Sequence, residues 1–172
     1  MPVYALGDQH PTIASDAYIH PDAVVIGSVT IGSESSVWPS AVLRGDDGEI
    51  RIGARTSIQD GAVIHTTLQL PTIVGDGCVI GHLVHLEGCR VEDGALVGSN
   101  SVVLHDAVIG AGALVAASAV VLGGTKVPPG AMAMGIPAAI REGRSDPADI
   151  ATSAQSYVDR GHRFARDLRR ID

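Results

Sequence analysis

The sequence predicts an all-β protein: a parallel β-helix with one C-terminal α-helix packed on its outside. Aliphatic residues recur at every sixth position over much of the chain. Glycine is abundant, at 21 of 172 residues, whereas aromatic residues make up only 3%. Near the C-terminus the apolar residues change to a helical spacing. We expect residues 1–140 to form the β-helix, and residues 141–172 to form a linker and the helix.

The repeat has a fixed step of six residues. After Val91 the aliphatic positions are Val97, Val103, Ile109, Val115, Val121 and Val127. The same step joins Ile31, Val37 and Leu43, and again Ile52, Ile58 and Ile64. The residue two before each aliphatic position is almost always small. Ordinary strands end in turns of variable length, so a constant step indicates identical strand-and-corner units. Three units form one triangular coil, and strands of successive coils stack ~4.8 Å apart.

The same register places the two cysteines and the end of the repeat. Cys78 and Cys89 occupy the small inward position, so we expect both in the core. The pattern ends near Val127–Ala138. The segment Ala148–Ile171 then reads as a helix with one apolar face, despite Gly161. A mobile basic tail is the alternative for this segment.

Composition limits the classes of partner. The net charge of −7, with no basic cluster before the extreme C-terminus, argues against nucleic acid as a main partner. No apolar run reaches the ~18 residues of a membrane span. The N-terminus has no basic region followed by an apolar run, and two cysteines are too few for a disulfide framework. We therefore expect a cytoplasmic protein that binds neither nucleic acid nor membrane.

The repeat also predicts which polar side chains are neighbours. We label the sides of the prism by their inward residues: side a has Ile52 and Val74, side b has Ile58 and Ile80, and side c has Leu43, Ile64 and Leu86. The residues that follow on side c are Arg44, His65 and Glu87, which we expect in one column. Their wider spacing is assigned to loops at residues 45–51 and 66–71.

A second polar group is predicted on side b. His82 lies two residues after Ile80, with Asp60 in the equivalent position one coil below and Gln59 beside it. His82 and Glu87 therefore point away from each other within one chain. They can share an ion only if side b of one subunit packs against side c of another, as in a threefold trimer.

Two further histidines are weaker candidates. His85 precedes Leu86, and we expect it at the corner of side b, outside both columns. It is read as an exposed histidine or as a substitute ligand. His105, on side c one coil away and one position further on, is a weak substitute ligand.

These residues resemble the γ-class carbonic anhydrase family, above all its short bacterial members. The similarity runs from about Val24 to Arg141 and includes "RGD", "IQDGAVIH", "VIGHLVHLEGC" and "GIPAAIRE". It implies a left-handed β-helix, a homotrimer, and a divalent metal held between subunits by three histidines. Two of these match His65 and His82. The third falls at Glu87, because this chain has "LEGC" where the family has "LHGC".

The resemblance also implies roles for neighbouring residues. Arg44 and Asp60 correspond to an ion pair across the trimer interface, and Gln59 to a group that hydrogen-bonds the solvent on the metal. Asp46 matches the Asp of "RGD" and is read as catalytic or structural. Tyr157 aligns with an aromatic residue of the family's C-terminal helix near the site. The family's acidic loop, with its proton-shuttling Glu, is replaced by "TTLQLP".

The glutamate changes the expected chemistry. Zinc accepts two histidines and one glutamate, and Fe²⁺ or Co²⁺ is an alternative. An anionic ligand reduces the charge that acidifies a bound water, so we expect weakened hydration of CO₂. One alternative is a non-catalytic metal-binding, scaffold or siderophore-binding protein. Another is a hexapeptide acyltransferase that uses an acyl-CoA donor, and metal content would discriminate between it and a metal-dependent lyase.

Overall fold

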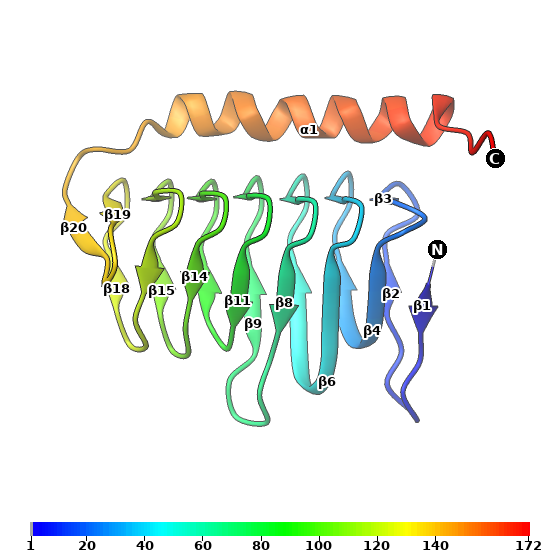
Figure 1. The fold of residues 1–172 in the computed structure, drawn as a ribbon, viewed down its shortest axis with the longest axis horizontal. Helices are drawn as coiled ribbons and strands as arrows, with labels where there is room; N and C mark the ends of the chain where they lie inside the picture. Colours follow the sequence, from blue (N-terminus) through cyan, green and yellow to red (C-terminus); the bar gives the residue numbers. More distant parts are fainter. Residues whose placement is uncertain (1) are drawn as a thin grey trace.

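The computed structural model describes residues 2–172 and shows a triangular parallel β-helix with one helix along its outside (Figure 1). This confirms the predicted fold class. Side b is an eight-stranded sheet made of β3 (Tyr18–Ile19), β5 (Ser36–Val37), β7 (Ser57–Ile58), β10 (Val79–Ile80), β13 (Leu96–Val97), β16 (Leu114–Val115), β19 (Met132–Met134) and β20 (Ala139–Arg141). Its pairs are parallel except β19–β20, an antiparallel pair at the C-terminal end of the coil.

Sides c and a form one twelve-stranded sheet, because two long strands pass round the corner between them. These are β4 (Val24–Ile31) and β6 (Val42–Ile52). Side c continues with β8 (Val63–His65), β11 (His85–Glu87), β14 (Val102–Val103) and β17 (Val120–Val121). Side a continues with β9 (Thr72–Val74), β12 (Arg90–Val91), β15 (Val108–Ile109) and β18 (Lys126–Val127). The short strands β1 (Val3–Tyr4) and β2 (Thr12–Ile13) pair with β4.

The predicted loop at residues 45–51 is wrong, because β6 runs through it without a break. It stays paired with β4, with a register shift between Gly27 and Val29. Glycines on both strands permit this close approach: a Cβ on Gly45 would lie 2.6 Å from the carbonyl oxygen of Ser28. The second predicted loop, residues 66–71, is confirmed and protrudes between β8 and β9 (Figure 1).

The corners explain the constant step. Seven residues spaced by six have φ between 59° and 73°, namely Gly94, Asn100, Asp106, Gly112, Ser118, Gly124 and Gly130. This left-handed conformation favours Gly, Asn and Asp. One such residue in each unit turns the chain after a two-residue strand. Leu83 has the same conformation, with φ 59°, which is uncommon for a residue with a large side chain.

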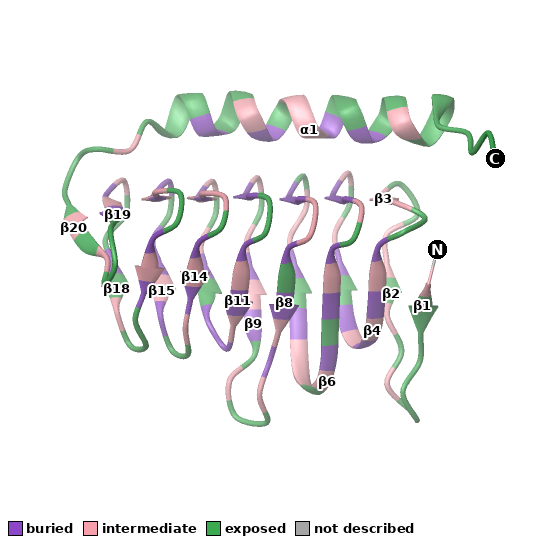
Figure 2. Ribbon diagram, in the orientation of Figure 1, coloured by how far each residue is buried: buried purple, intermediate pink, exposed green. Residues whose placement is uncertain are grey.

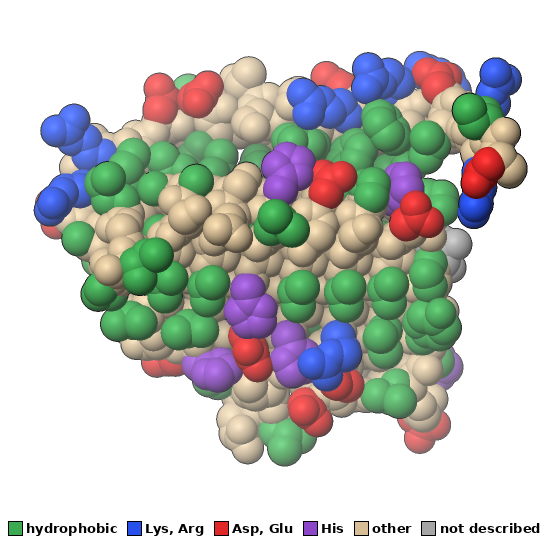
Figure 3. Space-filling view, viewed as in Figure 1, with side chains coloured by type: hydrophobic (Ala, Val, Ile, Leu, Met, Phe, Trp, Pro, Cys, Tyr) green, Lys and Arg blue, Asp and Glu red, His purple; other side chains and the backbone are tan. Residues whose placement is uncertain are grey.

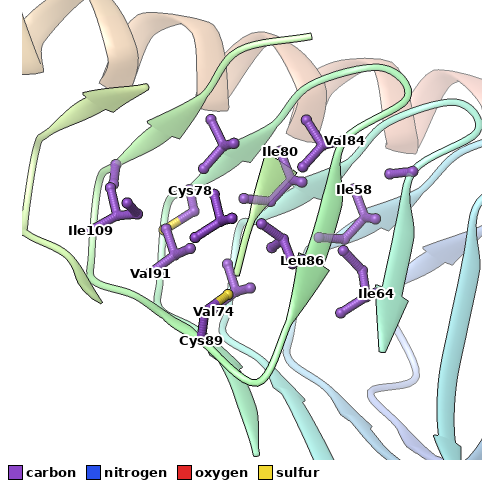
Figure 4. Packing of buried hydrophobic residues seen from close by; sticks show 14 of the residues in the cluster. Ile58, Ile64, Val74, Cys78, Ile80, Val84, Leu86, Cys89, Val91 and Ile109 are labelled. Atoms are coloured by element: carbon purple, nitrogen blue, oxygen red, sulfur yellow. The ribbon is translucent and has the colours of Figure 1, made fainter. Parts of the chain in front are cut away.

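The aliphatic residues of the repeat fill the prism. Ile58, Ile64, Ile80 and Leu86 have an exposed fraction of 0%, and Figure 2 shows buried residues in the coils between the two ends of the β-helix. Cys78 and Cys89 lie in this core as free thiols, as predicted (Figure 4).

Helix α1 (Pro147–Asp167) begins one residue before the predicted range and ends four residues before its end. Asp146 caps it by accepting hydrogen bonds from the backbone N–H groups of Ala148 and Asp149. Its buried residues are Ile150, Ala154, Val158 and Gly161. The helical prediction is thus correct and the mobile tail is not. The helix ends before Leu168 and Ile171, which are 45% and 90% exposed.

Aromatic residues attach the helix to side b. Trp38 lies 5.7 Å from Tyr157 and 5.1 Å from Phe164, measured between ring centroids. Tyr18 packs against Trp38 and Phe164. Four of the chain's five aromatic rings are therefore used for docking the helix. Within residues 2–172, no helix combines the length and apolar character that a membrane span needs.

Gly161 gives a sharp test of this docking. A Cβ at this position would lie 3.4 Å from Tyr18 Cβ and 3.7 Å from Ser36 Cβ, so a methyl group fits. We expect Gly161→Ala to raise the free energy of unfolding by ~0.5–1 kcal/mol, because alanine favours the helix. Gly161→Leu should lower it, because a larger side chain separates α1 from the sheet. Urea unfolding of both variants measures the effect, and a strongly destabilised alanine variant would contradict this packing.

The buried thiols predict a loss of stability in alkali. Burial raises the pKa of Cys78 and of Cys89 from 9.0 to about 12. Since the unfolded chain ionises first, their contribution to stability is complete below pH 9 and is lost between about pH 9 and 12. At pH 9 a thiol reagent should modify native protein far more slowly than urea-unfolded protein. Rapid labelling of both cysteines in the native protein would exclude the inward placement.

Candidate metal centre

The polar column on side c is present as predicted. Arg44 of β6 is paired in register with His65 of β8, and His65 is paired with Glu87 of β11. Figure 3 shows this face, with basic, acidic and histidine side chains gathered below a row of apolar ones. The column arises because residues in equivalent positions of parallel, in-register strands point to the same side.

Glu87 contacts three histidines of its own chain. Its Oε1 lies 3.1 Å from His65 Nδ1 and 3.5 Å from His105 Nε2, and its Oε2 lies 3.1 Å from His85 Nε2. Burial alone would raise the pKa of Glu87, but hydrogen bonds from the three imidazoles outweigh it and hold the pKa below its ordinary value. The carboxylate is therefore ionised at neutral pH.

The predicted place of His85 is wrong. It is not at a corner of side b but lies on β11, two residues before Glu87, so both side chains point outward from the same face. His105 also reaches the cluster, from the turn after β14. The sequence could have predicted that His85 lies close to Glu87, because residues i and i+2 of a strand share a face.

Asp46 holds the other edge of the His65 ring. Its Oδ1 lies 3.0 Å from His65 Nε2, and its Oδ2 contacts Arg44. Burial would raise the pKa of Asp46, but the hydrogen bonds from His65 and Arg44 lower it overall. Arg44, which the resemblance pairs with Asp60 across an interface, thus has Asp46 as its partner within this chain.

His82 lies at the corner after β10, on side b. Its Nδ1 is 2.8 Å from Oδ2 of Asp60, and both side chains are about half exposed. The expected stacking of these two residues in successive coils is confirmed. Gln59 beside them is buried, at 4% exposure. Tyr157, expected near the site, packs on Trp38 under the helix.

The sequence-predicted trio of His65, His82 and Glu87 does not converge within a single chain, in line with their places on two sides. Among residues 2–172, the trio of possible ligand atoms that all lie within 4.8 Å of one another is Asp46, Asp47 and His65. Asp47 was missed in the sequence, although the acidic pair in "RGDD" signals it. Imidazole nitrogens and carboxylate oxygens suit Zn²⁺, Fe²⁺ or Co²⁺, so the residues present fit a divalent metal.

An apolar column runs beside this polar one. Val24, Val42, Val63, Val102 and Val120 stack in register on the outer face of side c, with His85 among them. Val63 is 40% exposed. A row of outward valines next to a polar cluster is typical of a surface that packs against another protein surface.

Comparisons with known proteins agree with this architecture. The family model "Bacterial transferase hexapeptide (six repeats)" matches residues 10–45 and 88–123. A crystal structure of a hexapeptide transferase family protein from Anaplasma phagocytophilum superposes with a TM-score of 0.91 and 32% identity, covering 95% of this chain and 98% of that one.

Several curated relatives carry the name carbonic anhydrase. The carbonic anhydrase of Geobacillus kaustophilus is 41% identical over 164 residues, which is 94% of this chain and 90% of that protein. Gamma carbonic anhydrase 2, mitochondrial, of Arabidopsis thaliana is 40% identical over 108 residues, which is 59% of this chain but 39% of that protein. The chain therefore belongs to the γ-class carbonic anhydrase-like family of hexapeptide-repeat proteins.

Proposed function

We propose that this protein is a homotrimer that binds one divalent metal at each subunit interface and acts as a weak γ-carbonic anhydrase-like lyase on CO₂, bicarbonate or a similar small electrophile. One observation carries the proposal. His65 and His82 lie on adjacent sides of the prism, and a carboxylate oxygen lies 3.1 Å or less from Nδ1 of each. Each is half of a metal site, and a neighbouring copy supplies the other half.

The valine column supports the assembly. Its residues lie on the same face as His65. Side b of each chain is covered by α1, so the stripe packs against the neighbour's corner after β10, which brings His82 of that neighbour toward His65. Burial of apolar surface stabilises such a contact by ~25 cal/mol per Å². A threefold arrangement repeats the contact at each interface and leaves no stripe uncovered.

The metal, when bound, supplies the Lewis-acid chemistry that lowers the pKa of water toward neutrality. The protein's part is to hold two imidazoles and to place Gln59 so that its amide orients the attacking solvent. The third protein ligand is a carboxylate instead of the family's imidazole. Its charge opposes the acidification of water, so turnover at neutral pH is reduced rather than abolished.

Acyl transfer is the second candidate. A carboxylate that orients an imidazole, as Asp60 does for His82, also prepares that imidazole as a general base. The structural similarity to a hexapeptide transferase family protein agrees with this chemistry. A metal-independent transfer of an acyl group from acyl-CoA by the purified trimer would move the assignment to this class.

Metal analysis tests the main proposal. Purified protein should have the mass of three chains and contain close to one metal per chain. His65→Ala and His82→Ala should each remove most of the metal, because either change deletes one of two imidazole ligands. A chelator should abolish hydration of CO₂. A single-chain mass with no metal would refute the proposal, whereas chelator-sensitive assembly without turnover at any pH would indicate a scaffold.

Replacing the glutamate tests its electrostatic effect. Glu87→His places an imidazole at position 87 and removes a negative charge from the surroundings of His65, so the pH at which hydration reaches half its maximum should fall by about one unit. At pH 7 the rate should rise about tenfold. Stopped-flow hydration measured against pH compares the two proteins. Fast hydration by the original protein, with no gain in the variant, would contradict the argument.

A further inference from the structure

The two half-sites are built alike. Asp60 contacts Nδ1 of His82 at 2.8 Å, and Glu87 contacts Nδ1 of His65 at 3.1 Å. In each case the carboxylate and the imidazole lie in neighbouring coils of the same column. Metal-binding histidines usually donate their other ring N–H to a carboxylate, which fixes the tautomer and the orientation of the ring. With Nδ1 held in both residues, Nε2 is the nitrogen presented to a metal.

Glu87 is already engaged on both oxygens. Oε1 faces His65 and His105, and Oε2 faces His85. Direct binding of a metal by Glu87 would compete with its contacts to three imidazoles, including the one that holds the ring of His65, whereas Asp46 contacts one imidazole. A carboxylate that contacts three imidazoles from three coils is suited to hold rings in place.

Asp46 lies beside the nitrogen of His65 that Glu87 does not contact. Its Oδ1 is 3.0 Å from Nε2, the nitrogen that Glu87 leaves available. Two ligands of one metal with bonds of about 2.0–2.2 Å lie about 3.0–3.5 Å apart, so this pair already has the separation of two ligand atoms. Oδ2 of Asp46 is held by Arg44, and a ligating carboxylate is commonly hydrogen-bonded in this way. Asp47 lies in the same group of possible ligand atoms.

We propose that Asp46, and not Glu87, is the carboxylate ligand of the interface metal, and that Glu87 is a positioning residue that orients His65 as Asp60 orients His82. This assignment rests on the proposed interface site. The metal is then bound by His65 Nε2 and Asp46 Oδ1 of one subunit and by His82 Nε2 of the next. Two histidines and one carboxylate are a ligand set used by Fe²⁺, and Co²⁺ reports its geometry by absorption.

Matched amide substitutions separate the two roles. Asn at position 46 loses the anionic ligand, whereas Gln at position 87 keeps an oxygen that accepts a hydrogen bond from His65 Nδ1. In the full-length trimer, Asp46→Asn should weaken Co²⁺ binding more than about 100-fold and change the visible absorption bands. Glu87→Gln should keep the bands and nearly the original affinity, while Glu87→Ala should lose about 10–100-fold, as expected for a group that orients a ligand.

A second measurement does not depend on metal. Nitrogen NMR of the metal-free protein should show Nδ1 of His65 carrying a hydrogen-bonded proton in the original protein and in Glu87→Gln, and losing that hydrogen bond in Glu87→Ala, where the ring is held only through Nε2 by Asp46. Circular dichroism and mass measurements confirm that each variant remains a folded trimer. Loss of the cobalt bands in Glu87→Gln, with their retention in Asp46→Asn, would overturn the assignment. Failure of the original protein to bind Co²⁺ would instead refute the interface site itself.

Discussion

The fixed register between successive coils is the constraint on which the rest of the molecule depends. Each regular unit has one inward aliphatic side chain and one corner residue in the left-handed conformation, so the regular coils repeat one another at the spacing of hydrogen-bonded strands. A one-residue slip would turn the aliphatic residues outward and the polar ones inward. Because that slip is unfavourable, the outer columns stay aligned, including the columns of the candidate metal centre.

The outer columns bring polar side chains that are about twenty residues apart in the sequence into contact. On side c, His65 lies between two carboxylates from neighbouring coils, Asp46 and Glu87, each 3.0–3.1 Å from one of its nitrogens. On side b, Asp60 holds His82. The fixed coil spacing sets these contacts without any long loop, and the valine column beside them offers an apolar surface for a second subunit. In the proposed trimer, ligand geometry and subunit association therefore have the same structural origin.

A carboxylate at position 87 has a wider effect than the loss of one imidazole. Glu87 gathers His85 and His105, which gives the cluster three histidines around one negative charge. That charge, together with Asp46 and Asp47, makes the surroundings of His65 strongly anionic, with Arg44 as the cation in contact. Such surroundings favour binding of a divalent cation but oppose deprotonation of water on it. In the proposed interface site, the balance therefore shifts from hydroxide formation toward binding of the cation.

The sequence by itself determined the parallel β-helix, the inward cysteines, the C-terminal helix, and the columns of Arg44–His65–Glu87 and Asp60–His82, because all of these follow from a period of six and from residue polarity. It failed where the backbone departs from that period. Only the tertiary structure showed that β6 bends through the corner at Gly45, that His85 shares a face with Glu87, and that Tyr157 packs on Trp38. The contacts that assign Nδ1 and Nε2 of His65 to different carboxylates also required it, because rotamers and ring orientation depend on neighbours in space and leave no period in the sequence.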